Sequence, residues 1–253
     1  MKAIVLAAGF ATRMYPLTRD RAKPLLDVGG RPVLSWILDR VLEVPEVDEV
    51  VVVTNGRFEE QFEAWCAGYE ARVPVRVISD GTTDNESRLG AINDMSLGMV
   101  FLPDLSADFL VVAGDNLIDF DLRPFAERFE GEGKPLVLLR EIPGVVPPRT
   151  YNEVVVDPDG IIQSFREKPD EPTSNLSALC LYFLPADARA DLGRFLRRTM
   201  VPDAPGYFMA WLADQRPMVG MPVTGAWFDI GSLATLETAR EAFEGREEGE
   251  VAR

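Results

Sequence analysis

A chain of 253 residues with 47% hydrophobic residues can bury a substantial core, which excludes a disordered chain. The formal net charge of -15 argues against nucleic acid or an anionic membrane surface as a partner, and no apolar run is long enough to span a membrane. Histidine is absent, which excludes Ser-His-Asp and Cys-His nucleophiles and histidine-ligated metal sites. The chemistry must therefore use carboxylates, Lys, Arg, Tyr, backbone groups or a hard metal ion.

The first half of the chain alternates short apolar runs with helical patterns. Strands are predicted at 3–7, 50–54, 75–79, 109–113 and 136–139, and helices at 33–42, 59–70, 88–101 and 122–130. This alternation predicts a three-layer α/β fold with a mixed, mostly parallel sheet. Ligands of such sheets bind beyond the carboxyl ends of the strands.

The second half contains more strands in succession. Strands are predicted at 154–156, 161–167 and 179–184, and helices at 187–198, 207–214 and from Ser232, as the N-cap, to about residue 244. The proline-rich segment 142–151 is interpreted as a loop, either a lid over a substrate or an ordinary surface loop. No linker is evident, so we predict one domain over 1–253, with a nucleotide-binding half (about 1–140), an acceptor-binding half (about 141–244) and a frayed tail at 245–253.

The start of the chain and its cysteines indicate a cellular compartment. The first apolar run is too short, and too soon followed by charge and Pro16, for a signal peptide, so we interpret it as a buried strand. Cys66 and Cys180 lack metal-ligand spacing and are expected to be reduced thiols. We therefore expect a cytoplasmic protein.

A basic segment stands out in this acidic chain. Between residues 10 and 31 there are five cations and two acids, which suggests a site for a small anion. The first strand runs into a loop at Leu6, Ala8 and Gly9 whose backbone amides can bind phosphates, while Arg13 and Lys23 supply positive charge. The spacing matches neither the Walker A nor the Rossmann glycine motif.

This segment, LAAGFATRMYPLT followed by AKPLL, resembles the N-terminal signature of the sugar-phosphate nucleotidyltransferases. The resemblance implies the Rossmann-like nucleotide-diphospho-sugar transferase fold and Mg²⁺-dependent transfer of a nucleotidyl group from a nucleoside triphosphate to a sugar 1-phosphate, with release of pyrophosphate. It implies catalytic roles for Arg13, at the reacting phosphorus, and for Lys23, on the phosphates. Such a reaction needs no histidine, because the attacking phosphate is already an anion.

Two aspartates follow strand-like segments and resemble the metal ligands of this family. Asp115 ends the run FLVVAGD, and Asp229 lies in WFDIG, which is similar to the family's Trp-x-Asp-x-Gly signature. The resemblance implies that both carboxylates bind Mg²⁺, whose preferred ligands are oxygens. The alternatives are a turn or cap aspartate at 115 and an exposed aspartate at the start of a helix at 229.

The acceptor-binding residues are inferred from the second half. Glu167 and Lys168 resemble the family's Glu-Glu-Lys-Pro element, which implies that Glu167 binds sugar hydroxyls and that Lys168, a third catalytic residue, binds the sugar phosphate. Tyr151 and Asn152 stand where the family often has Tyr-Gly, and Asn116 follows the first metal aspartate. The alternative for the Glu-Lys pair is an ordinary surface pair.

The loop at 79–92 occupies the position where family members bind the base. We expect Asp80, Asn85 and Gly90 to contact the nucleotide, although a capped helix start explains the same residues. The usual glutamine pattern of thymidylyl- and uridylyltransferases is absent, and the asparagine-bearing loop is similar to the phosphocholine cytidylyltransferases. The base is left open.

Two residues depart from the family pattern. Ala11 replaces a glycine, so that its methyl group either crowds the phosphates or changes the path of the loop. Asn152 replaces the glycine of the family's Tyr-Gly pair, and asparagine tolerates a left-handed backbone better than most residues. The sequence ends soon after the last predicted helix, which suggests a short form without the C-terminal β-helix of some relatives.

Three other functions are considered. A CTP-dependent cytidylyltransferase for phosphocholine or inositol phosphate would keep the chemistry, and a choline site would need an aromatic cage, for which Tyr151, Tyr182 and Trp227 are candidates. A non-catalytic nucleotide-sugar sensor and a glycosyltransferase that uses Asp119 and Asp121 are the others. In each case the partners are small molecules, and a homo-oligomer is also considered.

Overall fold

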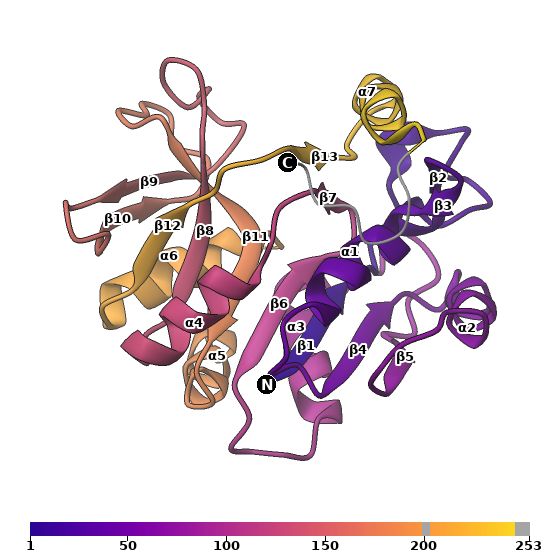
Figure 1. Ribbon diagram of the computed structural model, residues 1–253, viewed down its shortest axis with the longest axis horizontal. Coiled ribbons are helices and arrows are strands. Elements are labelled where there is room, and N and C mark those ends of the chain that lie inside the picture. Colours follow the sequence, from indigo (N-terminus) through magenta and orange to yellow (C-terminus); the bar gives the residue numbers. More distant parts are fainter. Residues whose placement is uncertain (199–202, 246–253) are drawn as a thin grey trace.

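The computed structural model describes residues 1–198 and 203–245, which form a three-layer α/β structure around a nine-stranded sheet (Figure 1). The sheet order is β10-β9-β11-β6-β1-β4-β5, and β8 pairs with both β11 and β12. The strands are β1 (Lys2–Leu6), β4 (Glu49–Thr54), β5 (Val75–Ser79), β6 (Phe109–Ala113), β8 (Leu136–Glu141), β9 (Glu153–Val156), β10 (Ile162–Arg166), β11 (Leu176–Leu184) and β12 (Val219–Pro222).

The sheet is mixed, as predicted. In the first half, β1, β4, β5 and β6 are parallel, because each connection crosses over through a helix or a long segment. In the second half, β11 is antiparallel to β6, β8 and β9, and β9 is antiparallel to β10. The turn between β9 and β10 closes with a hydrogen bond from the Gly160 amide to the Asp157 carbonyl (3.0 Å). Strands that return through short turns are necessarily antiparallel.

Helices cover both faces of the sheet. One face packs against α1 (Val33–Leu42), α2 (Glu59–Ala67) and α4 (Arg123–Glu132), and the other packs against α3 (Ala91–Phe101), α5 (Ala188–Leu196) and α6 (Gly206–Gln215). Helix α7 (Leu233–Phe243) joins the first of these cores through the contact of Phe243 with Trp36 of α1. Along β1, Ala3 and Val5 belong to the hydrophobic core on the side of α1, and Ile4 belongs to the core on the side of α3. Both faces of the strand are thus buried, which explains its continuous apolar sequence.

Several details differ from the sequence-based expectation. Helix α3 begins at Ala91, after Gly90 with φ 89°, so that the segment expected to open the helix is a loop. Two small two-stranded sheets were not predicted, because such short strands show no periodicity. One pairs β2 (Asp27–Val28) with β3 (Arg31–Pro32), and the other pairs β7 (Asn116–Ile118) with β13 (Trp227–Asp229). The Ser232 cap of α7 is confirmed, with a reciprocal Thr235 hydrogen bond.

The predicted tail at 245–253 lies outside the described residues from 246 onward. None of the helices in the described part of the chain has the length and apolar character needed to cross a membrane.

Candidate active site

A pocket of about 580 Å³ opens at the carboxyl ends of β1, β5 and β6 and extends to residues of β8 and β11. Most of the predicted site residues line it: Leu6, Ala8, Gly9, Arg13, Lys23, Asp80, Asn85, Gly90, Asp115, Asn116, Tyr151, Asn152, Glu167 and Asp229. Lys168 is exposed and is not among the lining residues. The topology therefore gathers into one cavity residues that are dispersed along the sequence from Leu6 to Asp229.

The loop after β1 is held by buried hydrogen bonds. The Gly114 amide donates to the Leu6 carbonyl (2.8 Å), which fixes the end of β1 against the end of β6. The fully buried Asn55 donates from Nδ2 to the Ala8 carbonyl (2.9 Å), and the Thr18 hydroxyl donates to the Ala11 carbonyl (2.7 Å). The loop is thereby preorganised at the wall of the pocket.

Ala11 adopts a left-handed backbone conformation, with φ 49° and ψ 40°. This is a conformation that glycine adopts without strain and that costs an alanine about 1 kcal/mol. The loop thus keeps a glycine-like backbone at this position, and Arg13 follows in the short 3₁₀ helix η1 (Thr12–Met14).

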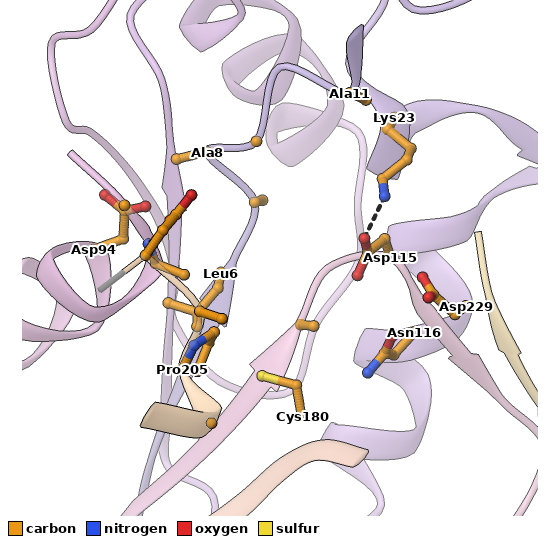
Figure 2. Close-up of a pocket in the computed structure, with 18 of the residues that line it drawn as sticks. Leu6, Ala8, Ala11, Lys23, Asp94, Asp115, Asn116, Cys180, Pro205 and Asp229 are labelled. Atoms are coloured by element: carbon orange, nitrogen blue, oxygen red, sulfur yellow. Dashed lines mark hydrogen bonds and ion pairs between the residues drawn. The ribbon is translucent and has the colours of Figure 1, made fainter. Parts of the chain in front are cut away.

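Lys23 and Asp115 form an ion pair inside the pocket (Figure 2). Lys23 comes from the 3₁₀ helix η2 (Lys23–Leu25), and Asp115 follows β6. The phosphate-loop cation and the strand-end carboxylate, which were predicted from separate motifs, are therefore in direct contact.

Asp229 lies beside Asp115 (Figure 2). The antiparallel pair β7–β13 places Asp229 opposite Asn116, and the Ile230 amide donates to the Asp115 carbonyl (3.1 Å). Burial and then the Asp115 charge raise the pKa of Asp229, while Lys23, Arg13 and Arg140 act in the opposite direction. Two adjacent carboxylates that repel each other form a donor set suited to a hard cation.

Among the described residues, no three or more Cys, Asp or Glu side chains are arranged so that they could hold a metal ion by themselves. A cation bound by Asp115 and Asp229 would therefore have to obtain its other oxygen ligands from phosphates and water.

Glu167 packs against the start of α6. A Cβ atom on Gly206 would overlap Glu167 Oε2, so this glycine leaves the space that the carboxyl occupies. Burial raises the pKa of Glu167, and the charge of Lys168 opposes the shift.

Asn152 does not use the left-handed conformation that the family glycine suggested. Among non-glycine residues of the described chain, only Ala11, Arg149 and Lys168 have positive φ. The Asn152 amide instead binds β11, donating to the Ala178 carbonyl (3.0 Å) and accepting from the Ala178 amide (2.6 Å). It thus fixes the pocket wall with its side chain.

Motif-based reasoning missed Arg140, which lies near the end of β8 and lines the pocket. Its guanidinium carbon lies 4.3 Å from the ring centre of Tyr151 and 4.0 Å from that of Trp227. Within the described residues it makes no ion pair or hydrogen bond. It is a cation held by two aromatic rings, with its donors available to a ligand.

Motif-based reasoning also missed Asp94, Asp203 and Cys180, which line the same pocket. Burial and then the charge of Asp115 raise the pKa of the Cys180 thiol to about 12, so it is a neutral thiol. Both cysteines are free, as expected.

A mixed α/β sheet that brings a cationic glycine loop and two carboxylates to one edge is the arrangement expected of a nucleotide-binding protein of the nucleotidyltransferase class. The nucleotidyl transferase family model matches residues 2–245, and the chain belongs to this family. The predicted family of transferases and the predicted fold are therefore confirmed.

Curated relatives match over most of the chain. The mannose-1-phosphate guanylyltransferase catalytic subunit beta of Drosophila pseudoobscura pseudoobscura is 26% identical over 230 residues, which cover 91% of this chain and 59% of that protein. The bifunctional protein GlmU of Methanococcus aeolicus is 29% identical over 236 residues, 91% of this chain and 51% of that protein. The chain thus spans between half and three fifths of the length of these relatives.

Solved structures share the fold over nearly the whole chain. A UDP-glucose pyrophosphorylase complexed with UDP-glucose superposes with a TM-score of 0.80 at 18% identity, covering 96% of this chain and 97% of that one. The UDP-glucose pyrophosphorylase from Acinetobacter baumannii superposes with a TM-score of 0.77 at 21% identity, covering 96% and 92%.

Proposed function

We propose that this protein transfers a nucleotidyl group from a nucleoside triphosphate to a sugar 1-phosphate and releases pyrophosphate. One observation carries the proposal: Lys23, on the loop that follows β1, is paired with Asp115, beside which lies Asp229. Cations for a triphosphate and carboxylates for Mg²⁺ meet in one pocket, as nucleotidyl transfer requires. The relatives named as sugar-phosphate nucleotidyltransferases support the same reaction.

The residues divide the work in a simple way. An oxygen of the sugar phosphate attacks the α-phosphorus in line, and the bond to pyrophosphate breaks. Arg13 and Lys23 neutralise the charge of the triphosphate, while the amides of the loop at Ala8 and Gly9 orient it. Asp115 and Asp229 would hold Mg²⁺, which would supply neutralisation of phosphate charge.

The acceptor end of the pocket fits a sugar phosphate better than phosphocholine. Glu167 offers carboxyl oxygens to sugar hydroxyls, and Arg140 offers donors to an anionic oxygen. The aromatic cage that a choline group would need is filled, because Tyr151 and Trp227 already stack on Arg140 and Tyr182 is only 1% exposed. A second cation placed there would be repelled. We keep Lys168 as a further ligand of the acceptor phosphate.

The two acids considered for a glycosyltransferase have other roles. Asp119 is 3% exposed and accepts a hydrogen bond from the Ala226 amide (2.6 Å), and Asp121 pairs with Arg123 (2.7 Å). Neither lines the pocket. The site therefore favours nucleotidyl transfer over glycosyl transfer.

The test is pyrophosphate release with Mg²⁺ across a grid of nucleoside triphosphates against sugar 1-phosphates, phosphocholine and inositol phosphate. We expect release with a sugar 1-phosphate and loss of release in Asp115→Ala with an unchanged circular dichroism spectrum. Release only with phosphocholine or inositol phosphate would replace the acceptor. If no pair of substrates released pyrophosphate while nucleotide binding was intact, the result would favour a nucleotide-sugar sensor or a glycosyltransferase.

A further inference from the structure

Two loop segments border the acceptor end of the pocket, and they are bound to each other. The proline-rich segment 142–151 connects β8 to β9, and the segment 167–175, called here the acceptor segment, connects β10 to β11 at the same end of the sheet (Figure 1). Three backbone hydrogen bonds join them, from the amides of Ile142, Val146 and Arg149 to the carbonyls of Asn175, Ser174 and Pro169 (2.8, 2.9 and 3.0 Å, respectively). The two segments therefore form one unit.

This unit contains two non-glycine residues in a left-handed backbone conformation, one in each segment. The φ angle is 57° at Arg149 and 49° at Lys168. Such a conformation persists only where the surrounding contacts determine it. The side-chain pair of Arg149 with Asp170 (2.5 Å) is largely exposed, and exposed pairs contribute little. The backbone of this unit therefore requires an anchor from the interior.

Glu153, the first residue of β9, is that anchor. It is 1% exposed, and its Oε1 accepts hydrogen bonds from the Ser174 amide (2.6 Å), from the Thr173 amide and from the Thr173 hydroxyl (3.2 Å). Its Oε2 accepts from Arg166 Nε (2.8 Å) and Nη2. Arg166 immediately precedes the acceptor segment, and the other donors lie near its end. One buried carboxylate thus ties together the two ends of the segment.

The hydrogen bonds of Glu153 are charge-assisted. Burial favours the neutral carboxyl group, but the amides of Thr173 and Ser174 and the guanidinium of Arg166 outweigh burial and lower the pKa of Glu153 below its ordinary value of 4.5. Hydrogen bonds to an ionised acceptor are stronger than those between neutral groups. Glu167, which lines the pocket, directly follows Arg166 in the chain, so the pair fixes the backbone beside it.

We propose that Glu153 is a positioning residue for the acceptor: it holds the two segments as one unit and thereby places Glu167, Lys168 and Tyr151 for binding of a sugar 1-phosphate. This inference rests on the proposed function, because it concerns the acceptor of the same site. Glu153 does not line the pocket and acts through its neighbours. The preceding residue, Asn152, binds β11, so consecutive side chains fix this wall from two directions.

Glu153→Gln keeps the size of the side chain but removes its charge and turns an N–H donor toward the donors that surround it. We expect the amides of Thr173 and Ser174 to exchange with solvent deuterium roughly tenfold faster or more, because each loses a charge-assisted hydrogen bond or gains a weaker one. We expect the KM of the acceptor to rise about tenfold and the KM of the triphosphate to stay nearly unchanged, because the acceptor segment alone is loosened.

The test combines hydrogen exchange of the free protein with steady-state kinetics in which each substrate is varied in turn. Glu171→Gln, the same substitution at an exposed position of the acceptor segment, is the matched control and should leave both measurements unchanged. Arg166→Gln is a second variant for the case that Glu153→Gln does not fold. It removes only the partners of Oε2 from a half-exposed side chain, and it should raise the acceptor KM in the same direction by a smaller factor.

Wild-type exchange rates at Thr173 and Ser174 in Glu153→Gln would overturn the proposal, because Glu153 would not hold the segment. Faster exchange with an unchanged acceptor KM, or with an equal rise in the KM of both substrates, would also overturn it, since Glu153 would then serve the fold alone. The proposed function fails separately. A wild-type protein that releases no pyrophosphate with any sugar 1-phosphate would reject that function, and the acceptor role of Glu153 with it. Release by the wild type, with an equal acceptor KM in the variant, would reject only the role of Glu153.

Discussion

Lys23 and Asp115, 92 residues apart in the sequence, form an ion pair in the pocket. The contact joins the basic loop after β1 to the end of β6. The carboxylate oxygen that accepts from Lys23 is also an oxygen that a divalent cation would use. A metal ion bound at the proposed site would therefore compete with Lys23 for Asp115 until phosphate oxygens of the substrate paired with the ammonium group.

Lys23→Gln should separate catalysis from metal binding. We expect turnover to fall about 10²- to 10³-fold, because a cation on the triphosphate is lost. We expect the affinity for Mn²⁺, measured by electron paramagnetic resonance without nucleotide, to stay the same or rise, because the competing ammonium is removed. The matched control is Lys134→Gln, which removes a cation that pairs with Glu132 away from the pocket. A clear loss of Mn²⁺ affinity in Lys23→Gln would contradict this interpretation.

Asp229→Asn should weaken metal binding without weakening the fold. Burial and the charge of Asp115 raise the pKa of Asp229, so its ionised form is unfavourable in the folded protein. We expect a Tm in metal-free buffer that equals or exceeds that of the wild type, a Mn²⁺ affinity at least tenfold lower, and loss of turnover. Asp159→Asn, in the exposed turn between β9 and β10, is the control. A drop of several degrees in Tm would show that Asp229 serves the fold.

The sequence predicts the parallel half of the sheet well, because buried strands such as 109–113 are short apolar runs and Asp115 directly follows one of them. It does not predict that Asp229 lies beside Asp115 without the family resemblance. The contact depends on β13, a strand of three residues, and on a partner more than 100 positions away. Tertiary pairing places this carboxylate.

Arg140 and Asp94 are missed for a related reason. Arg140 gains its role from Tyr151 and Trp227, which meet it only in the folded chain. Asp94 stands in a helix as an isolated acid, a pattern that usually indicates a solvated face, and it becomes distinctive only through burial beside Asp203. Each residue is ordinary in sequence and unusual only in its environment.

Gly206→Ala should displace Glu167 and impair acceptor binding. The added methyl group would overlap the end of the Glu167 side chain, which is flexible enough to move, so the protein should fold. We expect the KM for the acceptor to rise about tenfold or more with a nearly unchanged KM for the triphosphate. The control is Gly193→Ala in α5, where the nearest atom to the new Cβ is Arg197 Nη1 at 3.9 Å. The Gly193→Ala variant should keep its activity, and its free energy of unfolding should rise by about 0.5–1 kcal/mol, because alanine is more favourable than glycine in the interior of a helix. Equal kinetics in both variants would argue against a role of Glu167 on the acceptor.

Arg140→Gln should also act on the acceptor. The guanidinium is the cation that Tyr151 and Trp227 hold in the pocket, so its loss should raise the KM of the sugar 1-phosphate about tenfold, which corresponds to about 1.4 kcal/mol. Steady-state kinetics with each substrate varied in turn would check this. Arg128→Gln, which breaks an exposed pair with Glu132 on α4, provides the control. A change confined to the KM of the triphosphate would assign Arg140 to the nucleotide instead.

Asp94→Asn should change how stability depends on pH. The pKa of Asp94 is raised from an ordinary value of 3.8 to about 7 by burial and by Asp80 and Asp203, so the folded protein binds more protons than the unfolded chain between these values. The stability contributed by protonated Asp94 is present below about pH 4 and is lost as the pH rises through 7. The Asn variant lacks this loss, and its advantage over the wild type should grow with pH, to at most about 4 kcal/mol at 1.36 kcal/mol per pKa unit.

Urea unfolding at a series of pH values from 4 to 8 would measure the difference between the wild type and Asp94→Asn. The control, Asp104→Asn, should show a difference that is nearly constant over this range, because hydrogen bonds from Ser106 lower the pKa of Asp104 from 3.8 and its titration therefore falls below about pH 4. A difference for Asp94→Asn that stays constant over this range would mean that Asp94 does not titrate near pH 7. Its carboxyl group would then have to be ionised, with a donor that relieves its burial, in the free protein.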